Sequence, residues 1–331
     1  MATLEDTWEY QTDIQIKFEA TNSAAFDKVW HMIGLKRALT GESTSFTTLW
    51  TVVGSGGQGS GGGGGMDATD RWLNLRGNAD ATGNWLCLRG PTGTALEDVW
   101  FCLINSSGSN QQGRFVVTDT APTGGGETTP PTFSGKIIDT GTMTIMERWD
   151  GADRPYRATV GMSGEGAWYF FASGAIGEHS TTVWMLGRTS ESSRRTGDLP
   201  GMFYIHTDDG VEAPYYLQQG NNWYAYHSDG STVVCSPVSP GYHAGTSGLN
   251  SIFNSTVIED KWETVDRTIP EWPLYVYSFE AGKEAFRGRI VDIYLCPGGA
   301  SNNIFEPTSG PPIESITMNS FWLPATSRMV I

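Results

Sequence analysis

Positive charge is scarce in this sequence. Lysine and arginine total 21 against 36 aspartates and glutamates, which gives a formal net charge of −15. A nucleic-acid groove needs clustered cations, and the one cluster here is the Arg194-Arg195 pair. An acidic surface also repels anionic membranes. We therefore expect neither a nucleic acid nor a membrane as a partner.

Long apolar runs are also missing. No stretch of about 18 apolar residues occurs, so no transmembrane helix is expected. The first residues carry Glu5, Asp6 and Glu9, where a signal peptide would carry positive charge. The sequence therefore predicts a protein that is made in the cytoplasm and used from there.

Cysteine is rare and widely spaced. Cys87, Cys102, Cys235 and Cys296 form no CxxC pair, which argues against structural zinc. We predict four reduced and mostly buried thiols. A disulfide is the alternative.

Catalytic signatures are lacking as well. The histidines form no HxH or HExxH pattern, and Gly161–Gly164 has the wrong spacing for a nucleophile elbow. The glycine tract Gly54–Gly65 lacks the GK[ST] of a phosphate-binding loop. Asp150, Asp153 and Asp208–Glu212 could offer oxygen ligands to calcium, but turn residues that cap their own backbone are favoured. We predict a protein that is not an enzyme and holds no cofactor or metal.

Glycine and bulky aromatic residues are abundant. The 42 glycines fit many tight turns, and the 13 tryptophans and 14 phenylalanines supply core material. Residues 22–40 place apolar side chains at helical spacing, which predicts a helix that buries Trp30 and Ile33 and ends at Gly41.

Most other apolar segments are short, rich in β-branched and aromatic residues, and bounded by turn residues, which predicts strands. They are Thr7–Glu19, Phe46–Val53, Arg71–Gly77, Asn84–Gly90, Val99–Ile104, Gly113–Thr118, Met143–Trp149, Arg157–Val160, Ala167–Ser173, Thr181–Leu186, Gly201–His206, Trp223–Tyr226, Val233–Cys235, Leu274–Phe279, Gly288–Leu295 and Ser320–Leu323. We predict an all-β, β-sandwich-like fold with many short antiparallel strands and one N-terminal α-helix.

Two strands repeat the pattern W-L-x-L-R-G, at Arg71–Gly77 and Asn84–Gly90, and are predicted to pair with each other. In each, the tryptophan shares a face with the central residue and the leucines share the other. We predict a single β-rich unit over residues 1–331. Asp119–Pro131 is a candidate internal boundary by composition, and Gly54–Gly65 is predicted to be a flexible loop.

Several segments resemble virion proteins of tailed bacteriophages. These are Trp30–Gly41 with Leu49–Ser55, Trp85–Pro91 with Val99–Ile104, and Phe286–Leu295 with Phe321–Pro324, in the same order along the chain. The family pattern leaves residues 123–278 without a counterpart. The resemblance implies a structural component of the tail, neck or baseplate, located in the virion and assembled in the host cytoplasm.

Such a protein would act by forming a ring or another homo-oligomer, with other virion proteins as further partners, through aromatic-rich interfaces. A candidate interface or glycan face comprises Tyr215, Tyr216, Trp223, Tyr224 and Tyr226, and a candidate C-terminal contact comprises Phe321, Trp322, Met329 and Ile331. One alternative function is a receptor- or glycan-binding module on the virion surface. Another is a tail-borne glycan hydrolase, which needs two carboxylates that the sequence does not single out.

Overall fold

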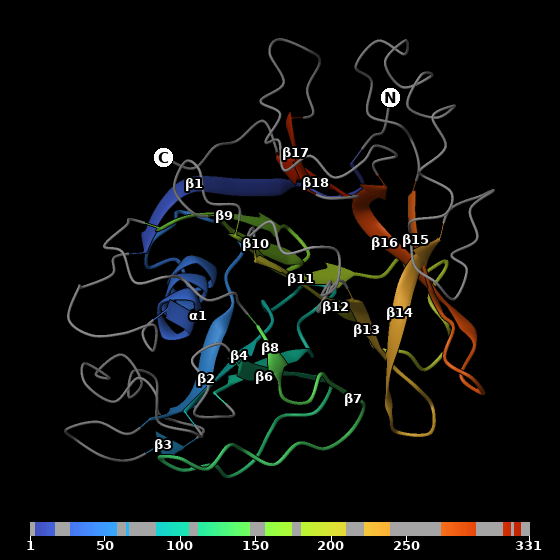
Figure 1. Cartoon of the computed structure of the whole chain (residues 1–331), viewed down its shortest axis with the longest axis horizontal. Helices are drawn as coiled ribbons and strands as arrows, with labels where there is room; N and C mark the ends of the chain where they lie inside the picture. The colour runs from blue at the N-terminus through green and yellow to red at the C-terminus, as the bar shows by residue number, and fades with distance from the viewer. Residues whose placement is uncertain are drawn as a thin grey trace.

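A computed structural model of the chain describes residues 4–16, 27–57, 64–65, 84–105, 112–145, 156–173, 180–209, 222–238, 273–295, 314–318 and 321–325. These residues form two antiparallel sheets and one helix, α1 (Asp27–Leu39) (Figure 1). The predicted all-β, sandwich-like fold with one N-terminal helix is therefore confirmed.

The larger sheet has eleven strands. Their hydrogen-bonded order is β1 (Trp8–Ile16), β9 (Tyr156–Ser163), β10 (Trp168–Ser173), β11 (Ser180–Arg188), β12 (Gly201–Asp209), β13 (Asn222–Tyr226), β14 (Thr232–Val238), β15 (Pro273–Ser278), β16 (Ala285–Leu295), β18 (Phe321–Ala325) and β17 (Glu314–Met318). The smaller sheet has seven, in the order β3 (Gly64–Gly65), β2 (Thr51–Gly56), β4 (Trp85–Arg89), β5 (Trp100–Ile104), β6 (Gln112–Thr118) and β7 (Ile137–Asp139), with β8 (Met143–Thr144) also paired to β6.

Helix α1 lies against the sandwich, as its apolar spacing predicts. Met32, Ile33, Leu35 and Leu39 are buried, and these positions recur at the three- and four-residue spacing of one helix face. The chain turns at Gly41, whose φ of +79° suits glycine. The side chain of Trp30 lies outside the described part, so its burial stays a prediction.

Most predicted strands in the described part are found close to their expected bounds, but one begins late, and β3, β7 and β17 have no predicted counterpart. The predicted strand Phe46–Val53 begins only at Thr51, because residues 46–50 form an irregular segment whose Phe46 and Trp50 side chains pack into the core. Trp50 there is 2% exposed, and its Nε1 donates to Gly166 O at 2.9 Å. Of the predicted strand Met143–Trp149, the described part shows β8, and residues 146–149 lie outside it.

Aromatic rings from the two sheets interleave in the sandwich core. The Phe101 ring centroid lies 5.0 Å from that of Trp168. Phe115 lies 4.6 Å from Phe203 and 5.2 Å from Trp184. All five rings are buried, and contacts at these separations add stabilisation beyond simple burial. The two sheets therefore share one continuous core.

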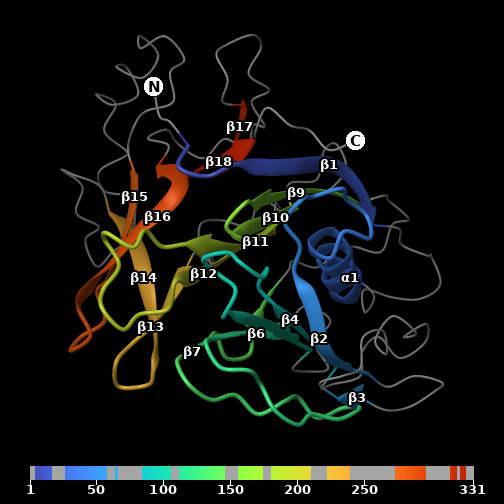
Figure 2. The same ribbon diagram turned by 180° about the vertical axis from the view of Figure 1, so that it is seen from behind.

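The eleven-stranded sheet curls, so its other face encloses a second group of aromatic rings. Tyr204 packs against Trp223 with ring centroids 5.2 Å apart. Thr189, directly after β11, forms a bridge with Ile290 in β16. Strands β11 to β16 thus close on themselves, and we call this unit the β11–β16 ring (Figures 1 and 2).

One carboxylate holds the N-terminal segment against β16. Asp292 is 2% exposed and accepts hydrogen bonds from Glu5 N at 2.7 Å, Asp6 N at 3.0 Å and Trp8 Nε1 at 3.0 Å. It lies in a bulge of β16, with a φ of +61°. Burial raises the pKa of the Asp292 carboxyl, and the three N–H donors oppose that rise. Strand β1, which follows this segment, lies beside β18 (Figure 1).

Residues 119–135 fold back over the outer face of the seven-stranded sheet. Trp85 Nε1 donates to Gly126 O at 2.9 Å. Phe133 packs on a small cluster formed by Trp85, Cys87, Cys102, Ile104 and Val116. The facing pattern predicted for the W-L-x-L strand is confirmed, since Leu86 and Leu88 lie in the main core instead. Its predicted pairing with Arg71–Gly77 is wrong, because β4 pairs with β2 on one edge and with β5 on the other. At the ends of the glycine tract, residues 54–56 belong to β2 and residues 64–65 form β3.

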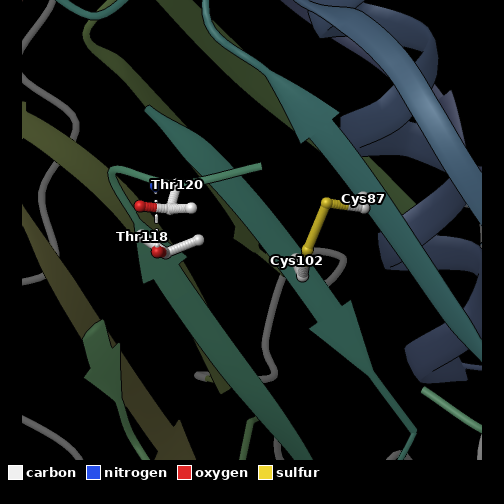
Figure 3. The surroundings of a disulfide bond; sticks show 4 residues. All are labelled: Cys87, Cys102, Thr118 and Thr120. Atoms are coloured by element: carbon white, nitrogen blue, oxygen red, sulfur yellow. Dashed lines mark hydrogen bonds between the residues drawn. A yellow bond between two sulfur atoms is a disulfide. The ribbon is translucent and has the colours of Figure 1, made fainter. Parts of the chain in front are cut away.

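The prediction of four reduced thiols is wrong for one pair. Cys87 and Cys102 are directly opposite each other on β4 and β5 and form a disulfide (Figure 3). Antiparallel neighbours that face each other across two strands bring their Cβ atoms close enough for such a bond. Cys235 is a free and buried thiol. Cys296 lies outside the described residues.

The disulfide should contribute measurably to stability. The double variant Cys87→Ala/Cys102→Ala should lose about 3 kcal/mol of unfolding free energy, because the bond closes a loop over a sequence separation of 15. Urea denaturation of the variant and of the oxidised wild type measures this loss. Alkylation of the denatured, unreduced wild type should spare both cysteines. Labelling of both cysteines, together with a stability that does not change when reductant is added, would contradict the disulfide.

Candidate functional site

The structure corrects the predicted aromatic face at two of its five residues. Trp223 is 0% exposed inside the β11–β16 ring. Tyr224 is 7% exposed on the opposite side of β13, where its hydroxyl donates to Met143 Sδ at 3.7 Å. Both sides of β13 are covered by the chain itself, so neither ring can stack on a glycan. Tyr226 is half-buried against the core. Tyr215 and Tyr216 lie outside the described residues.

The predicted C-terminal contact is described only in part. Phe321 and Trp322 lie in β18, where they pair with Leu295 and Tyr294 of β16. Strand β18 has β17 on its other side, so both of its backbone edges are used within this chain. The side chains of Phe321 and Trp322 lie outside the described part, as do Met329 and Ile331. The predicted contact therefore stays a prediction.

A different aromatic surface is exposed on the outside of the β11–β16 ring. It comprises Val234, Tyr275, Tyr277, Phe279 and Phe286, and we call it the outer aromatic face. Val234 is 37% exposed, and Phe279 and Phe286 are each 41% exposed. The Tyr277 and Phe279 ring centroids are 4.7 Å apart, and those of Tyr275 and Phe286 are 5.8 Å apart. Neighbouring rings thus form one apolar surface.

Strand register explains why these side chains share a face. Phe203 of the sandwich core pairs with Tyr224, and Tyr224 pairs with Val234. Further along the sheet, Tyr277 pairs with Phe286. Directly opposed residues of antiparallel strands point to the same side. The outer aromatic face is therefore the continuation of the sheet face that packs in the sandwich core.

This face is exposed because the seven-stranded sheet is narrower than the eleven-stranded one. Its last strand in that direction, β7, reaches only β13 and β14. There Asp139 N donates to Thr232 Oγ1 at 2.6 Å. Strands β15 and β16 lie beyond this contact, at one side of the molecule (Figures 1 and 2). Apolar side chains that continue past the edge of the second sheet meet solvent.

A buried arginine holds the loops at the end of the ring. Arg287 is 0% exposed, and its guanidinium donates to Tyr226 O at 3.1 Å and to Lys283 O at 3.3 Å. Its Nη1 also lies 3.7 Å from Asp198 Oδ2. Arg287 thereby joins the β13–β14 turn, the β15–β16 turn and the loop of residues 189–200.

The pKa shifts of Asp198 and Cys235 indicate a structural rather than a reactive role for these groups. Burial raises the pKa of Asp198, while the positive charge of Arg287 opposes that rise. Burial likewise raises the pKa of the Cys235 thiol to about 12, again against the effect of Arg287. A thiol with such a pKa is protonated at neutral pH and is a poor nucleophile.

The β13–β14 turn carries its own polar network. Hydrogen bonds from the Ser231 hydroxyl and backbone N–H hold the pKa of Asp229 well below its usual range. Lys283 Nζ donates to Ser231 Oγ at 2.7 Å, which ties this turn to the β15–β16 turn. Gly230 has a φ of +88°, and β13 pairs with β14 across this turn, as the dipeptide Asp229-Gly230 is typical of a hairpin.

The loop of residues 189–200 brings arginines to the same end of the ring. Arg194 lies against Gly288, where a Cβ atom would be 3.3 Å from Arg194 Cα. Arg195 is exposed, and its positive charge lies close enough to Asp198 to oppose the burial-induced rise in the pKa of that carboxyl. Within the described part of the chain, neither the Arg194 nor the Arg195 guanidinium has an ion-pair partner. The sequence shows this arginine pair but not its position.

No protein family, no curated protein and no solved structure matches this chain. Among the described residues, no group of three or more His, Cys, Asp and Glu side chains could hold a metal ion. Of the calcium candidates, Asp150, Asp153 and residues 210–212 lie outside that part. The described chain also has no helix long and apolar enough to cross a membrane. A function is therefore proposed from the surfaces of the chain and from the resemblance of its segments to virion proteins.

Proposed function

We propose that this protein is a structural component of a tailed-phage particle, in the tail, neck or baseplate. It acts by assembly, with copies of itself and other virion proteins as partners. The resemblance of its N-terminal and C-terminal segments to virion proteins supports the virion part of this proposal. The outer aromatic face supports the assembly part.

Exposed rings of this kind favour association. Phe279 and Phe286 each leave 41% of their surface in contact with solvent. Covering apolar surface is favourable by about 25 cal/mol per Å². Contiguous apolar patches on a protein surface commonly mark interaction sites, and aromatic residues are enriched at interfaces. The outer aromatic face is the observation that carries the assembly part of the proposal.

Purified particles of a phage that encodes this sequence provide the direct test. Quantitative mass spectrometry should find the chain in a fixed number of copies per particle. Labelled antibodies against it should bind at one axial position in electron micrographs. The chain should remain through density-gradient purification in high salt. Particles that form and infect normally without the chain in their protein inventory would refute the proposal.

A glycan-binding module is the second candidate, and the same surface favours it. The rings of Tyr275, Tyr277, Phe279 and Phe286 are flat apolar surfaces, and Glu280 beside them carries hydrogen-bonding oxygens. A glycan array separates the two functions. If this module is the function, the wild type binds defined glycans and Phe279→Ala/Phe286→Ala does not. Leu49→Ala is the matched control, because Leu49 is also exposed, at 38%, but lies outside this face.

A further inference from the structure

The Cys87–Cys102 disulfide is enclosed on both sides of its sheet. Both cysteines are 0% exposed. One side of β4 and β5 faces the sandwich core. On the other side, within the part of the chain that the structure describes, residues 119–135 lie over the small cluster that contains the two cysteines, with Phe133 packed on it. We call residues 119–135 the cover.

Two hydrogen bonds from side chains of β4 and β6 attach the cover to the sheet beneath it. Trp85 Nε1 donates to Gly126 O at 2.9 Å, and Thr118 Oγ1 donates to Ser134 O at 2.7 Å. Phe133 is the one large apolar side chain that the cover contains, and it is half-buried. A segment that buries so little apolar surface opens at a lower free-energy cost than the whole fold. The cover can therefore open while both sheets stay intact.

Strand register leaves one line of approach to the sulfur atoms. Gly54, Cys87, Cys102 and Val116 are opposed in turn on β2, β4, β5 and β6, so they share one side of the sheet. The S–S bond joins β4 to β5 along this row (Figure 3). Val116, which is 0% exposed, lies beyond Cys102. Gly54 lies beyond Cys87 and has no side chain, so the row is open at that end.

Glycines of the cover lie next to the open end of this row. Gly56 lies two residues further on, on the same side of β2, and a Cβ atom on it would overlap Gly126 O. A Cβ atom on Gly125 would lie 2.6 Å from Cζ2 of Trp85. The backbone of the cover therefore lies directly on β2 and β4, one pair of residues away from Cys87.

We propose that the cover controls thiol–disulfide exchange at this bond, and that an entering thiolate attacks the sulfur of Cys87 in line with the S–S bond. The attack forms a mixed disulfide between the entering thiol and Cys87. Cys102 leaves as a thiolate and takes up a proton. A second thiolate then attacks the entering sulfur, which forms the disulfide of the reductant and releases Cys87, also as a thiol after protonation. While the cover is closed, the bond persists in a reducing solution.

Reduction of the native full chain by excess reduced glutathione tests the cover. Trp85→Phe and Thr118→Val each remove one of the two attaching hydrogen bonds, so each should raise the rate of reduction about tenfold. Trp50→Phe is the matched control, because Trp50 Nε1 also donates to a carbonyl oxygen, that of Gly166, away from the cover. This control should be reduced at the wild-type rate. Alkylation at timed intervals, followed by mass spectrometry, measures the rates.

The dependence of the rate on urea separates opening of the cover from unfolding of the chain. Low concentrations of urea should change the wild-type rate little, since opening of a short segment exposes little surface. This measurement uses the wild type alone, so it decides the question even where a variant fails to fold.

The position of the mixed disulfide tests the line of attack. Quenching the reaction with an alkylating reagent should trap glutathione on Cys87 and the alkyl group on Cys102. Val116→Ala should move part of the glutathione to Cys102, because the smaller side chain clears the line beyond that sulfur.

Four results would overturn the inference. The wild type could be reduced as fast as the unfolded chain, or both cover variants could be reduced at the wild-type rate. The wild-type rate could rise steeply with urea, in step with global unfolding. Glutathione could also be trapped mainly on Cys102 of the wild type, which would refute the attack on Cys87. None of these results bears on the proposed assembly function, because the exchange is measured on the isolated chain.

Discussion

Replacing Arg287 with alanine should destabilise the protein by on the order of 3–5 kcal/mol. The guanidinium is fully buried, donates to two backbone carbonyls and faces Asp198. Its removal leaves Tyr226 O and Lys283 O without this donor, and takes from a largely buried carboxylate the positive charge that lowers its pKa most. Chemical denaturation at neutral pH measures the loss as a shift in the unfolding midpoint.

The loss should depend on pH in a defined direction. Burial raises the pKa of Asp198, and Arg287 opposes that rise, so the variant should have an even higher folded-state pKa. A folded carboxyl with a raised pKa takes up its proton before the unfolded one does. The variant therefore regains stability as pH falls through this folded pKa towards the unfolded value of about 4. The difference from the wild type should be largest above that window.

Two further variants make this result interpretable. Asp198→Asn in the Arg287→Ala background should remove the pH dependence and recover part of the lost stability, because no buried charge then remains. Arg289→Ala is the matched control. Arg289 is more exposed and pairs with Glu5 at the surface, so its loss should cost less than about 1 kcal/mol. Equal effects of the two arginine substitutions would show that Arg287 does not hold the loops together.

Local pattern was enough to predict much of this fold. In the strand from Trp85 to Leu88, alternation alone separates the residues of the small outer cluster from those of the main core, and the structure agrees. The turn at Gly230 and the helix face at Met32 and Ile33 follow from equally local signals. These features depend on neighbours within a few residues, which a sequence displays directly.

Pairing between distant segments could not be read in the same way. Strand β1 pairs with β9, with Trp8 opposite Ser163, and no local pattern indicates that partner. The Cys87–Cys102 disulfide depends on the register of β4 with β5. The spacing of 15 residues is compatible with many other geometries. Register is set by the whole hydrophobic pattern and by turn geometry, so it becomes known only with the sheet.

The candidate surface shows the same limit. The run from Pro214 to His227 has the composition of a binding face, yet Trp223 and Tyr224 are buried because both sides of β13 are covered. Tyr275 and Tyr277 alternate with Leu274 and Val276, so the sequence marks two apolar sides of β15 equally well. The exposed side is decided by where the seven-stranded sheet ends, which is a property of the tertiary structure.

Replacing Asp292 with alanine should destabilise the protein by about 3–5 kcal/mol. One buried carboxylate accepts hydrogen bonds from Glu5 N, Asp6 N and Trp8 Nε1. The indole donor is buried and would lose its acceptor, which alone costs about 1–3 kcal/mol. Alanine at a φ of +61° adds roughly 1 kcal/mol of backbone strain. Urea denaturation measures the total.

Two substitutions at the same position separate these contributions. Asp292→Gly tolerates the left-handed backbone but lacks the acceptor, so it should be about 1 kcal/mol more stable than Asp292→Ala and still clearly weaker than the wild type. Asp292→Asn keeps the shape and one acceptor oxygen. Its amide N–H₂ group, however, would face N–H donors whose hydrogen bonds the second carboxylate oxygen of Asp292 accepts. It should therefore fall between glycine and the wild type. Hydrogen exchange at Glu5 and Asp6 should speed up in all three variants. Wild-type protection in Asp292→Gly would show that the N-terminal segment is held by other contacts, such as the stacking of Trp8 on Tyr169.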